Sequence, residues 1–218
     1  AAVLLTFRLK SVRSKKVSVV YHGTAPVVAP REGNDVQGTN LLAVSDIYIQ
    51  KNYHTLLRAL AILRKSRTDL TLTIVGREID SHYAKTLRDM VRDLGLQDSV
   101  RFIGHVDTAE LDALYRDCQL FVFPSTVETF GNPLLEAMAR GAPIATSNAA
   151  AMPEVIGDAG LMFDPDNAQE IAARIATLLV DPKLRVELGR KAALRARSFT
   201  WEETARRTLG VLREAAGR

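Results

Sequence analysis

Short apolar runs alternate with longer amphipathic segments along most of this chain. The runs have the length of buried strands, and the segments between them carry apolar residues at helical spacing, as Leu56, Leu60 and Leu63 do. Strands that alternate with helices in this way predict βαβ units. We therefore expect an α/β fold, a doubly wound parallel sheet with helices on both faces. The expected strands are 41–44, 70–75, 100–103, 120–123, 143–146 and 161–163, and the expected helices outside the central unit are 54–63, 83–94, 108–116, 153–156, 167–180, 182–197 and 201–212.

The chain before residue 41 follows a different pattern. Val17 to Tyr21 is predicted to be one more strand, closed by His22 and Gly23. The stretch that follows, as far as Thr39, is rich in proline, glycine and polar residues, which is typical of a linker.

The central unit runs from Leu120 to Ser147 and opens with a buried strand. Gly131 then leads into a helix for which Asn132 is the expected N-cap and Pro133 the first helical residue. Gly141 ends that helix, and another short strand follows. The loop and the helix start thus lie at the carboxyl ends of parallel strands, where such sheets bind ligands.

Two carboxylates belong to this unit, Glu128 in the loop and Glu136 in the first turns of the helix. Between them, the backbone N–H groups of Phe130, Gly131 and Asn132 point out of the helix start, where donors and dipole attract an anion. A phosphorylated ribose or sugar fits this description, since the carboxylates can accept from its hydroxyls. For an isolated pair of glutamates the simpler interpretation is a solvated Glu128 and a Glu136 that only complements the helix dipole.

The rest of the stretch favours the ligand-binding interpretation, because it resembles the signature of the retaining glycosyltransferases of family 4. These glycosyl transferases group 1 have the two-domain GT-B architecture, and their signature carries two glutamates at this separation. The resemblance implies that Glu136 holds the ribose hydroxyls of a nucleoside-diphosphate sugar, that Glu128 touches the donor sugar, and that the amides of residues 130–132 cradle the diphosphate. The matching residues are Pro124-Ser125, Glu128-Thr129-Phe130-Gly131, Pro133 to Ala139 and Gly141-Ala142-Pro143.

Further candidates follow the earlier strands. The family commonly places an arginine two residues past the first regular strand and a lysine five residues beyond it, both on the diphosphate. Lys51 matches the lysine, but Asp46 stands in the place of the arginine. The resemblance therefore implies that Lys51 is the main positive charge against the leaving group, while Asp46 touches Lys51 or a substrate, or marks a divergent donor site. The loops after the next two strands add four nucleotide-binding candidates, for which ordinary surface roles are the alternative: Gly76, Arg77, Gly104 and His105.

The resemblance also implies a domain organisation. Residues 1–23 correspond to the remnant of an N-terminal acceptor domain and its hinge, and residues 24–40 to a linker. Residues 41–198 correspond to the Rossmann-like, nucleotide-sugar-binding domain, and residues 199–218 to a helix that returns toward the missing domain, with Trp201 as a packing anchor. Without that domain, we expect self-association or disorder at both ends of the chain.

Composition restricts the alternatives. The 218 residues, 47% apolar and 25% charged, suffice for one sizeable soluble domain. The net charge of +4 is concentrated in the C-terminal helices, which are either solvated or meet an anionic membrane surface. No apolar run has the length of a transmembrane helix, and the single cysteine, Cys118, is expected to be a buried thiol compatible with a reducing compartment. We expect a cytoplasmic protein, with the inner face of a membrane as a candidate contact.

The expected function is transfer of a sugar from a nucleoside diphosphate to an acceptor hydroxyl, with this chain as the donor-binding half. The acceptor, a glycan, lipid or small molecule, belongs to the missing domain, and no cofactor, metal or nucleic acid is expected. Asp164-Pro165-Asp166 resembles a metal-binding Asp-x-Asp, but its place before a helix favours a turn and an N-cap. His22, His54 and His82 lack the spacing of metal ligands.

Two alternatives stay open. A nucleotide-sugar epimerase shares the fold, but its carboxylate and histidine positions are not found. A non-catalytic nucleotide-binding module is favoured by one feature, Asp46 in the place of an arginine.

Overall fold

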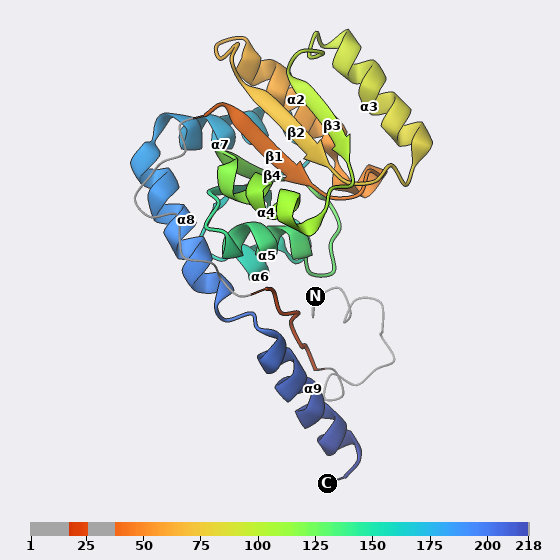
Figure 1. The fold of residues 1–218 in the computed structure, drawn as a ribbon, viewed down its shortest axis with the longest axis vertical. Coiled ribbons are helices and arrows are strands. Elements are labelled where there is room, and N and C mark those ends of the chain that lie inside the picture. The colour runs from red at the N-terminus through yellow and green to blue at the C-terminus, as the bar shows by residue number, and fades with distance from the viewer. Residues whose placement is uncertain (1–17, 26–37, 218) are drawn as a thin grey trace.

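Six parallel strands form the centre of the molecule, in a computed structural model that describes residues 18–25 and 38–217. Their order in the sheet is β3-β2-β1-β4-β5-β6, the order of doubly wound dinucleotide-binding folds, so the expected fold class is confirmed (Figure 1). The strands are β1 (Asn40–Val44), β2 (Thr71–Val75), β3 (Val100–Gly104), β4 (Leu120–Phe123), β5 (Ile144–Ser147) and β6 (Leu161–Phe163).

Helices cover both faces of the sheet because the central strands are apolar on both sides. In β1, Leu41 and Ala43 join a core cluster with α2, α3 and α7, whereas Leu42 and Val44 join a second cluster with α4, α5 and α6. The helices are η2 (Ile49–Lys51), α2 (Tyr53–Arg64), α3 (Ser81–Asp93), α4 (Thr108–Asp117), α5 (Asn132–Ala139), α6 (Met152–Ile156), α7 (Ala168–Val180), α8 (Pro182–Ala196) and α9 (Trp201–Ala215).

The start of α5 differs from the prediction by one residue. The N-cap is Gly131, whose φ of +92° is left-handed, and Asn132 is already helical. Glycine adopts such a φ without the steric cost of a Cβ, so the chain turns one residue earlier than the asparagine suggested. The Asn132 side chain is therefore not used as a cap and contacts His22 instead. Gly141 ends the helix with a φ of +67°, as expected.

The segment before residue 26 is not the strand that was expected. The described part, Ser18 to Ala25, has no strand conformation and lies against the beginning of α9, where Thr24 N–H donates to the carbonyl of Phe199 at 3.0 Å. Helix α9 itself extends away from the sheet (Figure 1), and none of its residues is buried. Trp201, expected to be a packing anchor, is 55% exposed. The domain boundaries stay a prediction, and residues 1–17 and 26–37 lie outside the described residues.

Candidate functional site

The loops after β1 and β4 meet where the strand order reverses. These two strands are neighbours in the sheet, and ligands of doubly wound sheets bind in the crevice outside their carboxyl ends. Lys51 comes from the turn η2 after β1, and Glu128 from the loop after β4. Lys51 Nζ lies 2.6 Å from Glu128 Oε1, with 8% and 13% of the two side chains exposed. The structure thus brings together two predicted site residues that are far apart in the sequence.

Lys51 is a charged group in a nearly dry environment. Burial by itself lowers the pKa of its ammonium group, but the hydrogen bond and the charge of Glu128 outweigh it and raise the pKa above the ordinary value. The Tyr48 ring, 4.9 Å from Nζ, adds a cation–π contact. Lys51 is therefore a fixed positive charge at neutral pH, not a solvated surface lysine.

A buried asparagine that the sequence did not single out joins three loops of this edge. Asn52, with a left-handed φ of +57°, donates from Nδ2 to the carbonyls of Pro124 at 3.1 Å and Pro165 at 2.7 Å. Its Oδ1 accepts from Thr55 Oγ1 at 2.6 Å. The loops after β1, β4 and β6 are thereby held in one arrangement. An asparagine tolerates this backbone conformation better than most residues, but nothing else in the sequence indicates its two distant partners.

Asp46 binds Arg77 and not Lys51. The carboxylate accepts from Arg77 Nη2 at 2.9 Å and from its Nε at 3.3 Å, and also from the backbone N–H of Arg77 at 2.9 Å. The hydrogen bonds from the Arg77 side chain are the main reason that the pKa of Asp46 is lowered. The arginine side chain stays 64% exposed, so its remaining N–H groups face solvent.

Gly76 allows the loops that carry Asp46 and Arg77 to lie close together. A Cβ at Gly76 would lie 2.0 Å from the carbonyl oxygen of Ser45, and φ at Gly76 is +149°. The β1 and β2 loops are thus in close contact at Gly76, and its role in nucleotide binding stays a prediction.

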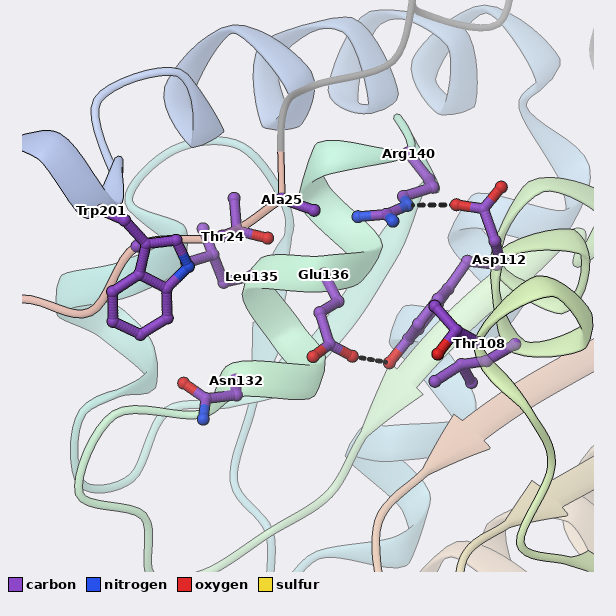
Figure 2. Close-up of a pocket in the computed structure, with 12 residues that line it drawn as sticks. Thr24, Ala25, Thr108, Asp112, Asn132, Leu135, Glu136, Arg140 and Trp201 are labelled. Atoms are coloured by element: carbon purple, nitrogen blue, oxygen red, sulfur yellow. Dashed lines mark hydrogen bonds and ion pairs between the residues drawn. The ribbon is translucent and has the colours of Figure 1, made fainter.

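Glu136 faces a cavity of about 280 Å³ between α4 and α5 (Figure 2). Tyr115 Oη donates to Glu136 Oε2 at 2.9 Å. Burial raises the pKa of this carboxyl group, although the hydrogen bond and the charge of Arg140 oppose the shift. Arg140 itself donates from Nε to Asp112 Oδ1 at 2.7 Å, and its Nη1 is buried without a hydrogen-bond partner among the described residues. The cavity therefore offers an acceptor carboxylate, with the Arg140 guanidinium in its wall.

The turn before α5 presents unused donors next to this cavity. In the described part of the chain, no group accepts a hydrogen bond from the backbone N–H of Gly131 or Asn132. Phe130 is buried beneath Tyr21, His22 and Phe199, which fixes the base of the turn. An anion at this helix start would meet both the donors and the helix dipole.

Two predicted residues lie at the same edge but apart from these groups. Gly104, with φ of +71°, ends β3, and its carbonyl accepts from Gly76 N–H at 2.8 Å. His105 is exposed in the next loop and makes no described contact with Lys51, Glu128 or Glu136.

The Asp164-Pro165-Asp166 segment forms a turn. Asp166 N–H donates to Asp164 Oδ1 at 3.0 Å, and Asn167, not an aspartate, caps α7. Within residues 18–25 and 38–217, no three His, Cys, Asp or Glu side chains are grouped as metal ligands. In the same ranges, no helix combines the length and the apolar character needed to cross a bilayer.

Known proteins with similar sequences agree with the motif around Glu128 and Glu136. The sequence profile of the family described as Glycosyl transferases group 1 matches residues 29–195. A D-inositol 3-phosphate glycosyltransferase of Pseudarthrobacter chlorophenolicus is 35% identical over 190 residues, which are 85% of this chain and 45% of that protein. The chain thus spans less than half the length of this relative.

Two solved structures are similar in fold. The crystal structure of Anabaena Alr3699/HepE in complex with UDP and glucose matches 95% of this chain and 60% of that chain, with a TM-score of 0.82 and 23% identity. The C-terminal domain of a glycosyl transferase group 1 family protein (LpcC) from Francisella tularensis is 26% identical, with a TM-score of 0.68 over 82% of this chain and 95% of that chain.

Proposed function

Because the chain belongs to the glycosyl transferases group 1, a family of glycosyltransferases, we propose that it is the donor-binding half of a retaining enzyme of family 4. The reaction moves a sugar from a nucleoside diphosphate to an acceptor hydroxyl. The bond from the anomeric carbon to the diphosphate oxygen breaks, a bond to the acceptor oxygen forms on the same face of the sugar, and the proton of the acceptor hydroxyl passes to the departing diphosphate.

The observation that carries this proposal is the Lys51–Glu128 pair beside the open amides of the α5 turn. Negative charge develops on the diphosphate as it leaves. A buried ammonium group and preorganised N–H donors stabilise that charge more in the transition state than in the ground state. Glu128, which holds the ammonium group in place, is also close enough to the same crevice to position the donor sugar.

The nucleoside occupies the cavity beside α5. Glu136 accepts from the ribose hydroxyls, for which its half-buried carboxylate is already oriented by Tyr115. The guanidinium of Arg140, in the wall of the same cavity, supplies positive charge beside the nucleoside. The HepE structure contains UDP and glucose, so a uridine nucleotide is the first ligand to test.

Arg77 supplies the second positive charge of the diphosphate site. Asp46 binds two of its three guanidinium nitrogens, and the side chain stays 64% exposed at the sheet edge, beside the loop that carries Lys51. This pair takes the place of the arginine that the family commonly has at the position of Asp46. Arg77→Ala is expected to weaken UDP binding several-fold and uridine binding little, because only UDP carries the diphosphate.

The acceptor, a glycan, lipid or small molecule, binds a second domain outside this chain, in keeping with the 45% coverage of the inositol-phosphate relative. We place the protein in the cytoplasm, with its basic C-terminal helices as the face toward an anionic membrane.

The test is calorimetric titration of this chain with UDP, GDP and ADP, followed by the sugar conjugate of the nucleotide that binds. We expect one nucleotide to bind and Glu136→Ala to weaken it by about ten-fold. A folded chain that binds none of the three at millimolar concentration would contradict the donor-binding function. Binding together with a lack of transfer by the longer protein that contains this chain would instead favour a non-catalytic module.

A further inference from the structure

His22 reaches the start of α5 from a segment that is distant in the sequence. Its Nδ1 lies 3.1 Å from Asn132 Oδ1, although 110 residues separate the two. Since a side-chain amide oxygen only accepts, the imidazole is the donor, with its proton on Nδ1. His22 thus contacts the turn at Gly131, whose N–H groups face the crevice.

The ring of His22 also packs against Phe130 of the turn and Trp201 of α9. Its centroid lies 5.0 Å from that of Phe130 and 6.1 Å from that of Trp201, on which it is stacked. Phe130 immediately precedes Gly131, so the histidine touches residues on either side of the left-handed glycine. A glycine with few steric restraints depends on such neighbours to hold one conformation.

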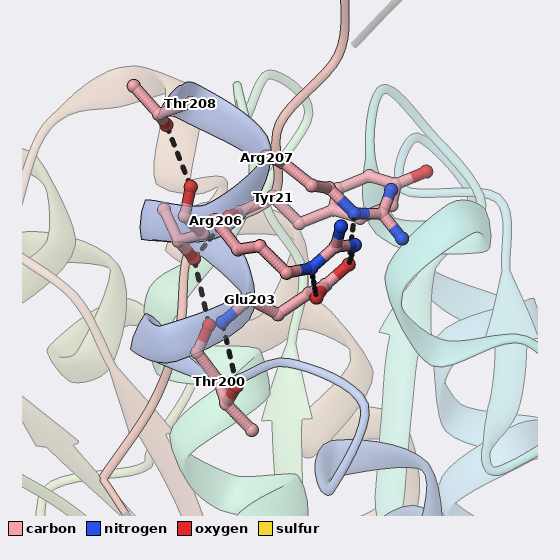
Figure 3. Close-up of polar contacts among 7 residues, drawn as sticks. Tyr21, Thr200, Glu203, Arg206, Arg207 and Thr208 are labelled. Atoms are coloured by element: carbon pink, nitrogen blue, oxygen red, sulfur yellow. Dashed lines mark hydrogen bonds and ion pairs between the residues drawn. The ribbon is translucent and has the colours of Figure 1, made fainter. Parts of the chain in front are cut away.

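The residues on either side of His22, Tyr21 and Gly23, also make close contacts. Thr204 Oγ1 donates to the carbonyl of Tyr21 at 2.7 Å (Figure 3), and the Tyr21 hydroxyl donates to Glu154. Gly23 lies so close to α9 that a Cβ there would be 2.2 Å from the backbone nitrogen of Trp201. The backbone on both sides of His22 therefore contacts the start of α9, and the Tyr21 side chain contacts α6.

We propose that His22 is a positioning residue of the donor site, which holds Asn132 and Phe130 so that the amides of the Gly131 turn stay directed at a diphosphate. This inference rests on the proposed donor-binding function. It assigns a role in donor binding to a residue that comes before the sheet and lies outside the motif that contains Glu128 and Glu136.

The test is a double-mutant cycle measured by calorimetry with UDP, or with whichever of GDP and ADP binds more tightly. His22→Phe keeps the ring contacts and removes the Nδ1 donor, and we expect it to raise the Kd for the nucleoside diphosphate about five-fold. Asn132→Ala is expected to do the same. The double variant should be no weaker than Asn132→Ala, because the histidine acts through the asparagine.

Two further measurements separate this role from general stability. His22→Asn places an amide donor near the position of Nδ1 and should restore most of the affinity, whereas the Kd for uridine, followed by NMR titration, should not change in any of these variants. His82→Phe, on α3 and outside the crevice, is the matched control and should leave the Kd for the diphosphate unchanged.

The outcomes distinguish the two levels of the proposal. Additive losses in the cycle, or equal losses for uridine and the diphosphate, would overturn the role of His22 while leaving donor binding intact. A wild-type chain that is folded and binds no nucleotide would overturn both.

Discussion

Lys51 and Glu128 carry opposite charges at a place where solvent reaches little of either side chain. Removing one partner of such a pair leaves the other charge buried without compensation, whereas replacing both by apolar groups avoids that cost. We therefore predict that Glu128→Ala lowers the free energy of unfolding by about 2–4 kcal/mol. Lys51→Met combined with Glu128→Leu should recover most of this loss and still abolish sugar transfer.

Urea denaturation of the three variants, together with a transfer assay of the longer protein, checks this prediction. A double variant as unstable as Glu128→Ala would show that the pair contributes more to stability than its desolvation costs. Retained transfer would remove Lys51 and Glu128 from the proposed chemistry.

Glu136 is held in an environment that disfavours its charge. Its folded-state pKa lies above the ordinary value of 4.5, so the folded protein binds this proton more tightly than the unfolded chain does. The stability that this group contributes is complete below pH 4.5 and is lost as the pH rises through the folded pKa. Glu136→Gln keeps an acceptor for Tyr115 and removes the charge. We predict that the variant is more stable than wild type at pH 7, because it carries no charge to bury, and that it binds nucleotide more weakly.

The free energy of unfolding of both proteins, measured from pH 4 to pH 7, tests whether Glu136→Gln is the more stable one. The difference between Glu136→Gln and wild type should grow with pH. A constant difference would mean that the carboxylate is not responsible, and unchanged nucleotide affinity would contradict its contact with ribose.

The sequence identified these charged residues because Glu128 and Glu136 belong to one short motif and Lys51 to another. It did not identify the partners of Asp46 and Asn132. The Asp46–Arg77 and His22–Asn132 contacts join residues 31 and 110 positions apart, and such contacts depend on how the loops fold over the sheet edge. Whether these residues bind a donor stays a prediction.

At the level of the elements, the side chain of Asn52 connects the loops after β1, β4 and β6. Asn52 makes two hydrogen bonds to carbonyls of the β4 and β6 loops, and it does so from a left-handed backbone. We predict that Asn52→Ala costs about 3 kcal/mol, from the buried carbonyls left unpaired and the added backbone strain. Asn52→Gly should cost about 1 kcal/mol less, because it relieves only the strain.

Denaturant titration of both variants gives these values. If the glycine variant were as stable as wild type, the hydrogen bonds would contribute nothing, and the loops would be held by other contacts.

The strands and helices were predictable because each has an apolar period that matches its packing. Two failures have a common physical origin. The α5 cap shifted to Gly131 because a left-handed turn begins there, and the stretch up to Tyr21 formed no strand because it found hydrogen-bond partners in the α9 start rather than at a sheet edge. The hydrophobic period shows which face of a helix or strand is apolar, but it does not predict which element packs against that face.

At the scale of the whole molecule, apolar side chains of α9 are exposed in the part of the chain that the structure describes. Trp201, Leu209 and Leu212 lie on one side of the helix and are 55%, 47% and 60% exposed. Trp201–Ala215 form a regular helix, and near its start hydrogen bonds from Arg206 and Arg207 lower the pKa of Glu203 to about 2 (Figure 3). The surface is therefore presented on a formed helix, and such surfaces favour association.

We predict that the chain self-associates as its concentration rises, and that Leu209→Glu with Leu212→Glu reduces this association. Val186→Glu, at an exposed apolar position on α8, is the matched control. Sedimentation velocity over a hundred-fold range of concentration is the measurement. A wild-type chain that sediments as a monomer throughout would show that this face needs another occupant.

Residues 21–24 and the start of α9 meet at a junction. There Thr24 bonds to Phe199, Thr204 bonds to Tyr21, and Gly23 rests on Trp201. A mechanical force that pulls residue 18 away from the end of α9 is borne first by this junction, and it reaches the strands only after the junction has opened. The ligand edge of the sheet is in this sense insulated from tension on the two ends, while His22, which is part of the junction, is the first residue near that edge to feel it.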